Sequence, residues 1–217
     1  MTRALEKGAT IHLPFGVLRV VLRWTPIGRG SGPAVPDLDL SALLVDAGGR
    51  VRSEGDFIFY NQPRHPTGLV RRLPKRRDAE GLRDTVEAEL TRLDATVRRV
   101  VLAVSADGDF RAAASRPRLA LHDAAAADGA PLAVLPLAPL RRETALVGGE
   151  LVRVAGNGWE FRASGGGYPG GLIALAADFG ITAANRRAPD PRRPPAYGYP
   201  QPDPAFTLPP QGPQFLP

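Results

Sequence analysis

The sequence predicts an all-β fold, mainly an antiparallel β-sandwich, followed by a short C-terminal helix and a disordered proline-rich tail. Short apolar segments with alternating polar residues recur along residues 1–187, and turn-forming residues separate nearly all of them. One segment near the end of this region has helical spacing instead. The last 30 residues hold 11 of the 23 prolines, which suit neither a helix nor the interior of a sheet.

Eight segments have the β-branched, aromatic or alternating composition that is typical of strands. They are VLRVVLRW at 17–24, DLDLSALLV at 37–45, DFIFYN at 56–61, RRVVLAVSA at 98–106, PRLALHD at 117–123, APLAVLPL at 130–137, TALVGGELVRV at 144–154 and GWEFRAS at 158–164. The segment 78–95 is ambiguous, because its propensities favour a helix whereas Thr85, Val86 and Ala88 also fit a strand.

The C-terminal region predicts one helix and then a tail. In GGLIALAADFGI, at 170–181, Leu172, Leu175 and Phe179 recur at helical spacing, and Gly180 is expected to end the helix. We therefore predict a β-sandwich domain over residues 1–187. Residues 188–217 are predicted to form an extended, partly polyproline-II tail.

Composition argues against several classes of protein. The chain has no cysteine, so disulfides and thiolate metal sites are absent, and its formal net charge is +6. No apolar stretch approaches 18 residues and no signal-peptide core is visible, so we expect neither a transmembrane helix nor a signal peptide. A cytoplasmic protein, or one peripheral at the inner membrane face, is compatible with this. The common catalytic motifs are missing, so we expect no enzymatic activity. An enzyme acting on a small metabolite at the glycine-rich loop SGGGYPGG, 164–171, is the distant alternative.

Two aspartates begin the segment 37–45 at strand spacing. Asp37, Asp39 and Ser41 are expected on one face, while Leu38 and Leu40 face the core. Like charges at this spacing repel each other unless a cation lies between them. Calcium takes six to eight oxygen ligands, for which such carboxylates are typical donors, and solvated acids at a strand edge are the alternative.

Several motifs, in the same order along the chain, resemble the TerD family, which is associated with tellurium resistance and bacterial stress response. They are KGATIHLP, VVLRWTP, DLDLSALLVDAGGRV, DFIFYNQP, VRRVVLAVSA and LVGGELVRVAGNGWEFRASGGGYPGGLIALAADFGI, and they cover residues 7–183. The resemblance implies a cytoplasmic, calcium-binding β-sandwich with no established catalytic reaction. It also implies other stress-response proteins of the Ter type as partners.

The resemblance implies two acidic calcium regions, of which this chain keeps one intact. The family's second region is a loop of the form GDNxTGxGxGDDE, but the chain reads RRLPKRRDAEGLRDTVEAEL there. The candidate metal ligands are Asp37, Asp39, Ser41, Asp56, Asp78, Glu80 and Asp84. Each lost carboxylate or added cation weakens calcium binding by about 2 kcal/mol. We therefore expect calcium binding to be weak or lost, and a calcium-binding switch protein of the same family is the alternative.

The same stretch is strongly basic, since residues 64–77 contain no acid. The candidates for binding an anionic partner are Arg71, Arg72, Lys75, Arg76 and Arg77. Such a cluster suits an anionic membrane surface, nucleic acid or an acidic protein. No aromatic residues interleave with it as single-stranded nucleic acid would require. A solvated basic loop is the alternative. The function expected overall is that of a non-enzymatic stress-response binding or scaffold protein with a degenerate calcium site.

Overall fold

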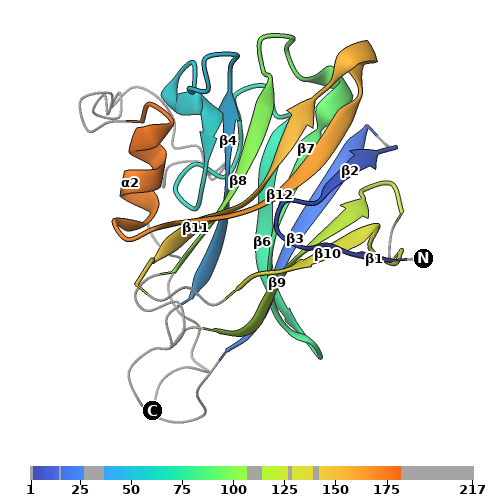
Figure 1. Cartoon of the computed structure of the whole chain (residues 1–217), viewed down its shortest axis with the longest axis vertical. Helices are drawn as coiled ribbons and strands as arrows, with labels where there is room; N and C mark the ends of the chain where they lie inside the picture. The colour runs from blue at the N-terminus through green and yellow to red at the C-terminus, as the bar shows by residue number, and fades with distance from the viewer. Residues whose placement is uncertain are drawn as a thin grey trace, which may run out of the picture. The chain divides into compact units, whose positions relative to one another are not determined.

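Two six-stranded sheets form the body of the protein (Figure 1). The computed structural model describes residues 2–14, 16–26, 37–106, 114–126, 129–138 and 142–181. Sheet A has the strand order β1-β10-β9-β3-β7-β6, and sheet B has the order β2-β12-β11-β8-β4-β5. The strands pair antiparallel except β1 and β10, which are parallel. The predicted all-β, mainly antiparallel fold is confirmed, whereas the predicted tail at 188–217 and the boundary at 187 lie outside the described residues.

The elements follow in chain order with short connections. The strands of sheet A are β1 (Arg3–Ala4), β3 (Val17–Pro26), β6 (Val70–Asp78), β7 (Gly81–Glu89), β9 (Ala114–Asp123) and β10 (Ala133–Pro136). Those of sheet B are β2 (Thr10–Leu13), β4 (Leu38–Val45), β5 (Phe57–Ile58), β8 (Arg99–Ala106), β11 (Ala145–Arg153) and β12 (Trp159–Tyr168). Three 3-10 turns, η1 (Glu54–Asp56), η2 (Leu90–Arg92) and η3 (Ala155–Asn157), and the helix α2 (Gly171–Asp178) complete the described chain.

The main core lies between the two sheets and is built from alternate residues of each strand. Leu18, Leu22 and Trp24 of β3 are fully buried, as are Leu38 and Leu40 of β4. Burying one such side chain contributes about 1.5–3 kcal/mol. The prediction that Leu38 and Leu40 face the core is confirmed.

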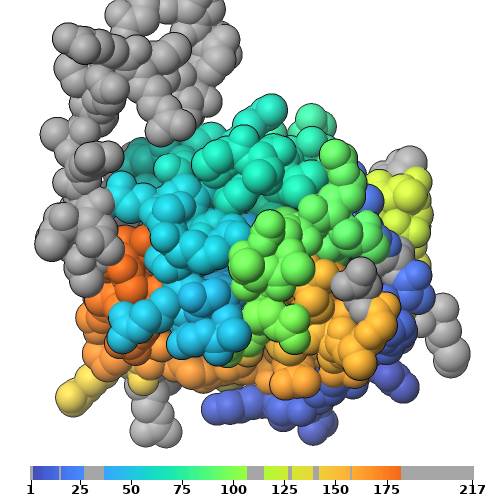
Figure 2. All heavy atoms as spheres, turned by 90° about the horizontal axis from the view of Figure 1, so that it is seen from above, coloured from blue at the N-terminus to red at the C-terminus, as the bar shows by residue number. Residues whose placement is uncertain are grey.

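A second apolar layer lies on the outer face of sheet B, under α2. Leu175 and Ala176 of α2 pack there with Leu43 of β4 and Val101 of β8. The backbone N–H of Val51 donates to the carbonyl of Phe179 at 2.9 Å, and Figure 2 shows the cyan segment around residue 50 beside the orange helix. The predicted helix is thereby confirmed. Within the described ranges, α2 and the other helical turns are too short or too polar to cross a membrane.

The predictions were wrong or incomplete in three places. The basic segment 70–78 is the strand β6, which tolerates Pro74 because it lies at the edge of sheet A, where the register shifts between Leu73 and Arg76. The ambiguous segment 78–95 contains the strand β7. The glycine-rich segment predicted as a loop instead continues β12 to Tyr168, paired with β11.

Candidate functional site

The β6–β7 hairpin presents its side chains to two different surfaces. Arg72 and Asp84 face β4 of sheet B, where Asp84 accepts a hydrogen bond from the Leu40 backbone N–H. Arg76 and Arg83 lie on the outer face of sheet A and line a hollow there. Because successive residues of a strand point to opposite faces, one basic segment of sequence is divided between two sites.

The first site, which we call the inner cluster, consists of Asp37, Asp39, Arg72, Lys75 and Asp84. Asp84 is completely buried, and its carboxylate pairs with Arg72, whose side chain is 7% exposed. The other oxygen of Asp84 accepts the backbone N–H of Thr85 at 2.9 Å. Burial raises the pKa of the Asp84 carboxyl, and Arg72 and the Leu40 N–H oppose that shift.

The position of Asp84 follows from the pairing of β4. The short strand β5 pairs only with Ala42 and Leu43, so it leaves the Leu40 N–H without a strand partner on that side. Asp84 satisfies this donor at 2.8 Å. A buried backbone N–H needs such a partner, which gives Asp84 a structural role in joining the two sheets.

Lys75 and Arg72 connect the remaining acids of the inner cluster. The Lys75 Nζ lies 2.5 Å from Asp37 Oδ2 and 3.0 Å from Asp39 Oδ1. Arg72 Nη2 reaches the same Asp39 oxygen at 2.9 Å. The two cations therefore lie between the carboxylates, at the place where the family resemblance implies a calcium ion.

Ser41 and Asp56 do not join this cluster. Ser41 is 1% exposed, and its Oγ has no hydrogen-bond partner in the described part of the chain. Asp56 directly precedes β5, in which Phe57 pairs with Leu43 of β4. This register places Asp56 five residues along β4 from Asp39, a distance of about 16 Å. Asp56 instead accepts from Arg52 and from His65 Nε2, the latter at 2.9 Å. Although burial acts in the opposite direction, these donors hold the pKa of Asp56 well below its ordinary value.

Asp78 and Glu80 lie on the opposite face of the hairpin from Asp84. Asp78 pairs with Arg23 at 2.9 Å, and Glu80 pairs with Arg118 at 2.9 Å. Both therefore belong to the outer face of sheet A. The seven predicted metal ligands are thus distributed over three separate places, with Ser41 buried beside the first.

The inner cluster does not fit a calcium shell in this arrangement. The facing oxygens of Asp37, Asp39 and Asp84 already accept hydrogen bonds from Lys75 and Arg72. Within the described residues, no three His, Cys, Asp or Glu side chains are placed to hold one metal ion. A calcium ion needs six to eight oxygens, and binding here would require both cations to leave.

The predicted anionic-partner residues are likewise divided. Arg72 and Lys75 are taken up by the inner cluster, and Arg71 pairs with Glu87 of β7. Arg76 lies on the outer face, opposite Arg83, and Arg77 follows it in the ladder. The structure divides them between two faces, because the segment is the strand β6 and its side chains point to both sides of the sheet.

The outer face of sheet A carries a groove that the sequence analysis missed. Arg19, Arg23, Arg83 and Arg118 line it, from three neighbouring strands. The available signal was the period-two placement of Arg19 and Arg23 within the strand 17–24, whose other face is apolar. Recognising the site also required the pairing of β3 with β7 and β9, which no local pattern reveals.

Conspicuous residues of the second half have structural roles. Arg153 of β11 donates to the carbonyls of Val97 and Leu93, and its guanidinium lies 4.7 Å from the centre of the Trp159 ring. Glu150 pairs with Arg99 at 3.0 Å. The Arg153 contacts fasten the loop before β8 to the sheet, and the Glu150–Arg99 pair joins β11 to β8, so the ELVR and GWEF motifs support the fold.

Comparisons with known proteins agree with the architecture. A family model described as TerD domain matches residues 1–179. The chain is 32% identical over 199 residues to "Tellurium resistance protein TerD" of Serratia marcescens, covering 85% of this chain and 100% of that protein. It is 31% identical over 204 residues to "General stress protein 16U" of Bacillus subtilis (strain 168), covering 83% and 98%. The crystal structure of a homologue of telluride resistance protein (TerD) from Streptomyces coelicolor A3(2) superimposes with a TM-score of 0.57 at 21% identity, covering 74% of this chain and 95% of that one.

Proposed function

Because this chain belongs to the TerD family, we propose that it is a non-enzymatic binding or scaffold protein of the tellurium-resistance, stress-response type that works without bound calcium. The observation that carries this function is the inner cluster, in which Arg72 and Lys75 lie among Asp37, Asp39 and Asp84. The protein's own cations take the place of a divalent ion there.

Electrostatics supports a calcium-independent domain. Asp84 and Arg72 are buried, so separating them would leave two unmatched charges in a low-dielectric region. A calcium ion would have to displace Arg72 and Lys75 and still find further oxygens. A protein whose acids are neutralised internally is folded and competent to bind partners at any calcium level. Other stress-response proteins of the Ter type are the partners that this function requires.

A calcium titration of the full chain, followed by melting temperature and calorimetry, tests this function. A site with a Kd of about 10 μM would stabilise the fold by roughly 3 kcal/mol at about 2 mM calcium. We expect no shift in melting temperature at that concentration. A rise of several degrees with stoichiometric uptake would establish the calcium switch instead and refute calcium independence.

A charge-removal variant sharpens the test. In Arg72→Gln/Lys75→Gln the carboxylates lose both cations, so we expect a lower melting temperature that calcium partly restores. The matched control is Arg76→Gln/Arg77→Gln, which removes the same charge from the same strand without touching these acids. Equal responses of the two variants to calcium would show that Arg72 and Lys75 are not what keeps the ion out of the inner cluster.

A further inference from the structure

Four arginines lie directly opposite one another across the outer face of sheet A. The strand register pairs Arg76 with Arg83, Arg83 with Arg23, and Arg23 with Arg118. The row therefore crosses β6, β7, β3 and β9 and spans about 14 Å, or three strand spacings. Like charges in directly opposed positions destabilise a sheet, so a row of this kind lowers the stability of the free protein.

The carboxylates nearby offset only part of this charge. Asp78 pairs with Arg23 at 2.9 Å and lies 3.8 Å from Arg83. Glu80 pairs with Arg118. No ion pair of Arg76 is found within the described ranges. The face keeps an excess of positive charge, which a bound anion would neutralise.

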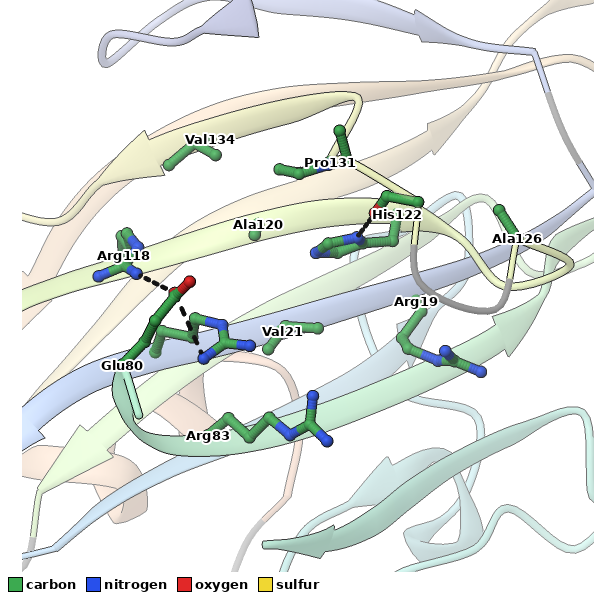
Figure 3. A pocket seen from close by; sticks show the side chains of 13 residues that line it. Arg19, Val21, Glu80, Arg83, Arg118, Ala120, His122, Ala126, Pro131 and Val134 are labelled. Carbon is green, nitrogen blue, oxygen red and sulfur yellow. Dashed lines mark hydrogen bonds and ion pairs between the residues drawn. The ribbon is translucent and has the colours of Figure 1, made fainter. Parts of the chain in front are cut away.

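The row borders a groove with an apolar floor (Figure 3). The groove has a volume of about 470 Å³, and Arg19, Arg83 and Arg118 surround a floor that includes Val21 and Ala120. A second hollow of about 280 Å³ shares Arg19, Val21 and Arg83 and extends to Arg76. The larger volume alone lies in the range of small-molecule sites.

Glu80 already demonstrates how an anion is held in this groove. One carboxylate oxygen lies 2.9 Å from Arg118 and 3.5 Å from Arg23, and the side chain is 64% exposed at the β6–β7 turn. An exposed ion pair of this kind contributes little to stability. The Glu80 side chain can therefore swing into solvent, which leaves Arg118 without a carboxylate and Arg23 paired with Asp78 alone, so both guanidinium groups can meet a better acceptor.

We infer that this groove binds a phosphorylated small molecule with at least two neighbouring negative charges, which displaces Glu80 from Arg23 and Arg118. Guanidinium groups hydrogen-bond phosphate oxygens in pairs, and several of them can share one polyphosphate chain. The floor of Val21 and Ala120 suits the less polar remainder of such a molecule. This site is separate from the inner cluster and does not depend on calcium.

The arginines are recessed, which favours a small ligand over a flat anionic surface. The side chains of Arg23 and Arg118 are 18% and 30% exposed. A membrane is recognised by basic side chains that project from the protein. Guanidinium groups inside a hollow are reached more easily by a molecule that fits into it.

His122 supplies a reporter inside the groove. Its Nδ1 donates to the carbonyl of Gly129 at 3.2 Å, since a carbonyl can only accept. Burial, with Arg23, Arg19 and Arg83 nearby, lowers the pKa of the ring. A bound anion would offset those positive charges, so the pKa of His122 should rise when the groove is filled.

Calorimetry of the full chain with inorganic pyrophosphate, and separately with ATP, tests the inference. We expect saturable binding that weakens as salt is raised. Arg118→Gln should weaken it about tenfold, because it removes one charge-assisted contact, and Glu80→Gln should tighten it because the internal competitor is lost. The control Arg162→Gln, on sheet B and 53% exposed, should leave binding unchanged.

Three calorimetric results would overturn the inference. They are no binding at millimolar pyrophosphate or ATP, equal effects of Arg118→Gln and Arg162→Gln, and an unchanged affinity in Glu80→Gln. Vesicles containing phosphatidylglycerol distinguish the source of the phosphate. Binding to vesicles without binding to either soluble probe would show a membrane surface instead. An unmoved His122 pKa at saturating pyrophosphate would place the ligand elsewhere.

Discussion

The two faces of the β6–β7 hairpin handle positive charge in opposite ways. On the inner face, Arg72 is buried and meets the carboxylates of Asp39 and Asp84. On the outer face, Arg76 and Arg83 stand opposite each other and carboxylates are in the minority. The difference follows from how far each face is exposed to solvent. A buried charge must be matched within the protein, whereas a charge on a wet face can remain available to a ligand.

The largest effect that tests this contrast is expected from Arg72→Leu. The change leaves the buried Asp84 carboxylate without its cation, so we expect a loss of about 3–5 kcal/mol in the free energy of unfolding. Urea denaturation followed by circular dichroism measures it. The matched control is Arg71→Leu, the residue before it on β6, whose side chain is 39% exposed. Its buried partner Glu87 keeps the ion pair with Arg19 at 2.9 Å, so this change should cost about 1 kcal/mol or less. Similar losses for the two variants would show that burial does not separate the faces.

The pattern of strands was largely predictable from the sequence, because alternation and turn residues are local signals. The strand β6 was not, since five basic residues and Pro74 within 70–78 have the composition of a solvated loop. Its neighbour β7 supplies the explanation. Once β7 pairs with β3, the edge position beside β7 accepts a charged strand that contains a proline.

The sites were predictable as residue types but not as groups. Asp37 and Asp39 were placed together from strand spacing alone, and Lys75 and Arg72 do lie beside them. Residues 71–77 are divided between two faces, because a strand sends alternate side chains to opposite sides, and their binding of an anionic partner stays a prediction. The groove escaped notice because Arg118 joins it through the pairing of β9 with β3, which connects residues about a hundred positions apart.

Acid titration compares two buried carboxylates, Asp56 and Asp84, each of which lies beside an arginine. Donors from His65 and Arg52 lower the pKa of Asp56, whereas burial raises that of Asp84. As the pH falls from neutral, carboxyl carbon shifts in NMR should therefore show that Asp84 takes its proton before Asp56 does. The reverse order would show that the Asp84–Arg72 pair outweighs its desolvation.

The same shifts have opposite consequences for stability. The folded-state pKa of Asp56 is depressed, so its contribution is present above the unfolded value of 3.8 and is lost as the pH falls below it. The folded-state pKa of Asp84 is raised, so the cost of burying its charged form lowers stability at neutral pH. That cost is relieved as the pH falls through the raised pKa of Asp84. We expect Asp56→Asn to cost about 2–3 kcal/mol at pH 7, and the cost should shrink below pH 4. A cost that does not change with pH would contradict the depressed pKa.

The smallest effect concerns the outer face, where the sign should be reversed. Arg83 stands between Arg76 and Arg23 in the cross-strand row, so Arg83→Thr removes two unfavourable oppositions and places a strand-forming residue there. We expect a gain of about 0.5 kcal/mol in the free energy of unfolding, measured by urea denaturation at low salt. The gain should shrink at about 1 M salt, where charges on a wet surface are screened beyond about 3 Å. Arg162→Thr on sheet B should give no such salt-dependent gain, because its neighbour Glu160 is an acid. If Arg83→Thr destabilised the protein at every salt concentration, the arginine row would stabilise the sheet. The outer face would then resemble the inner cluster, where the charges also stabilise the fold.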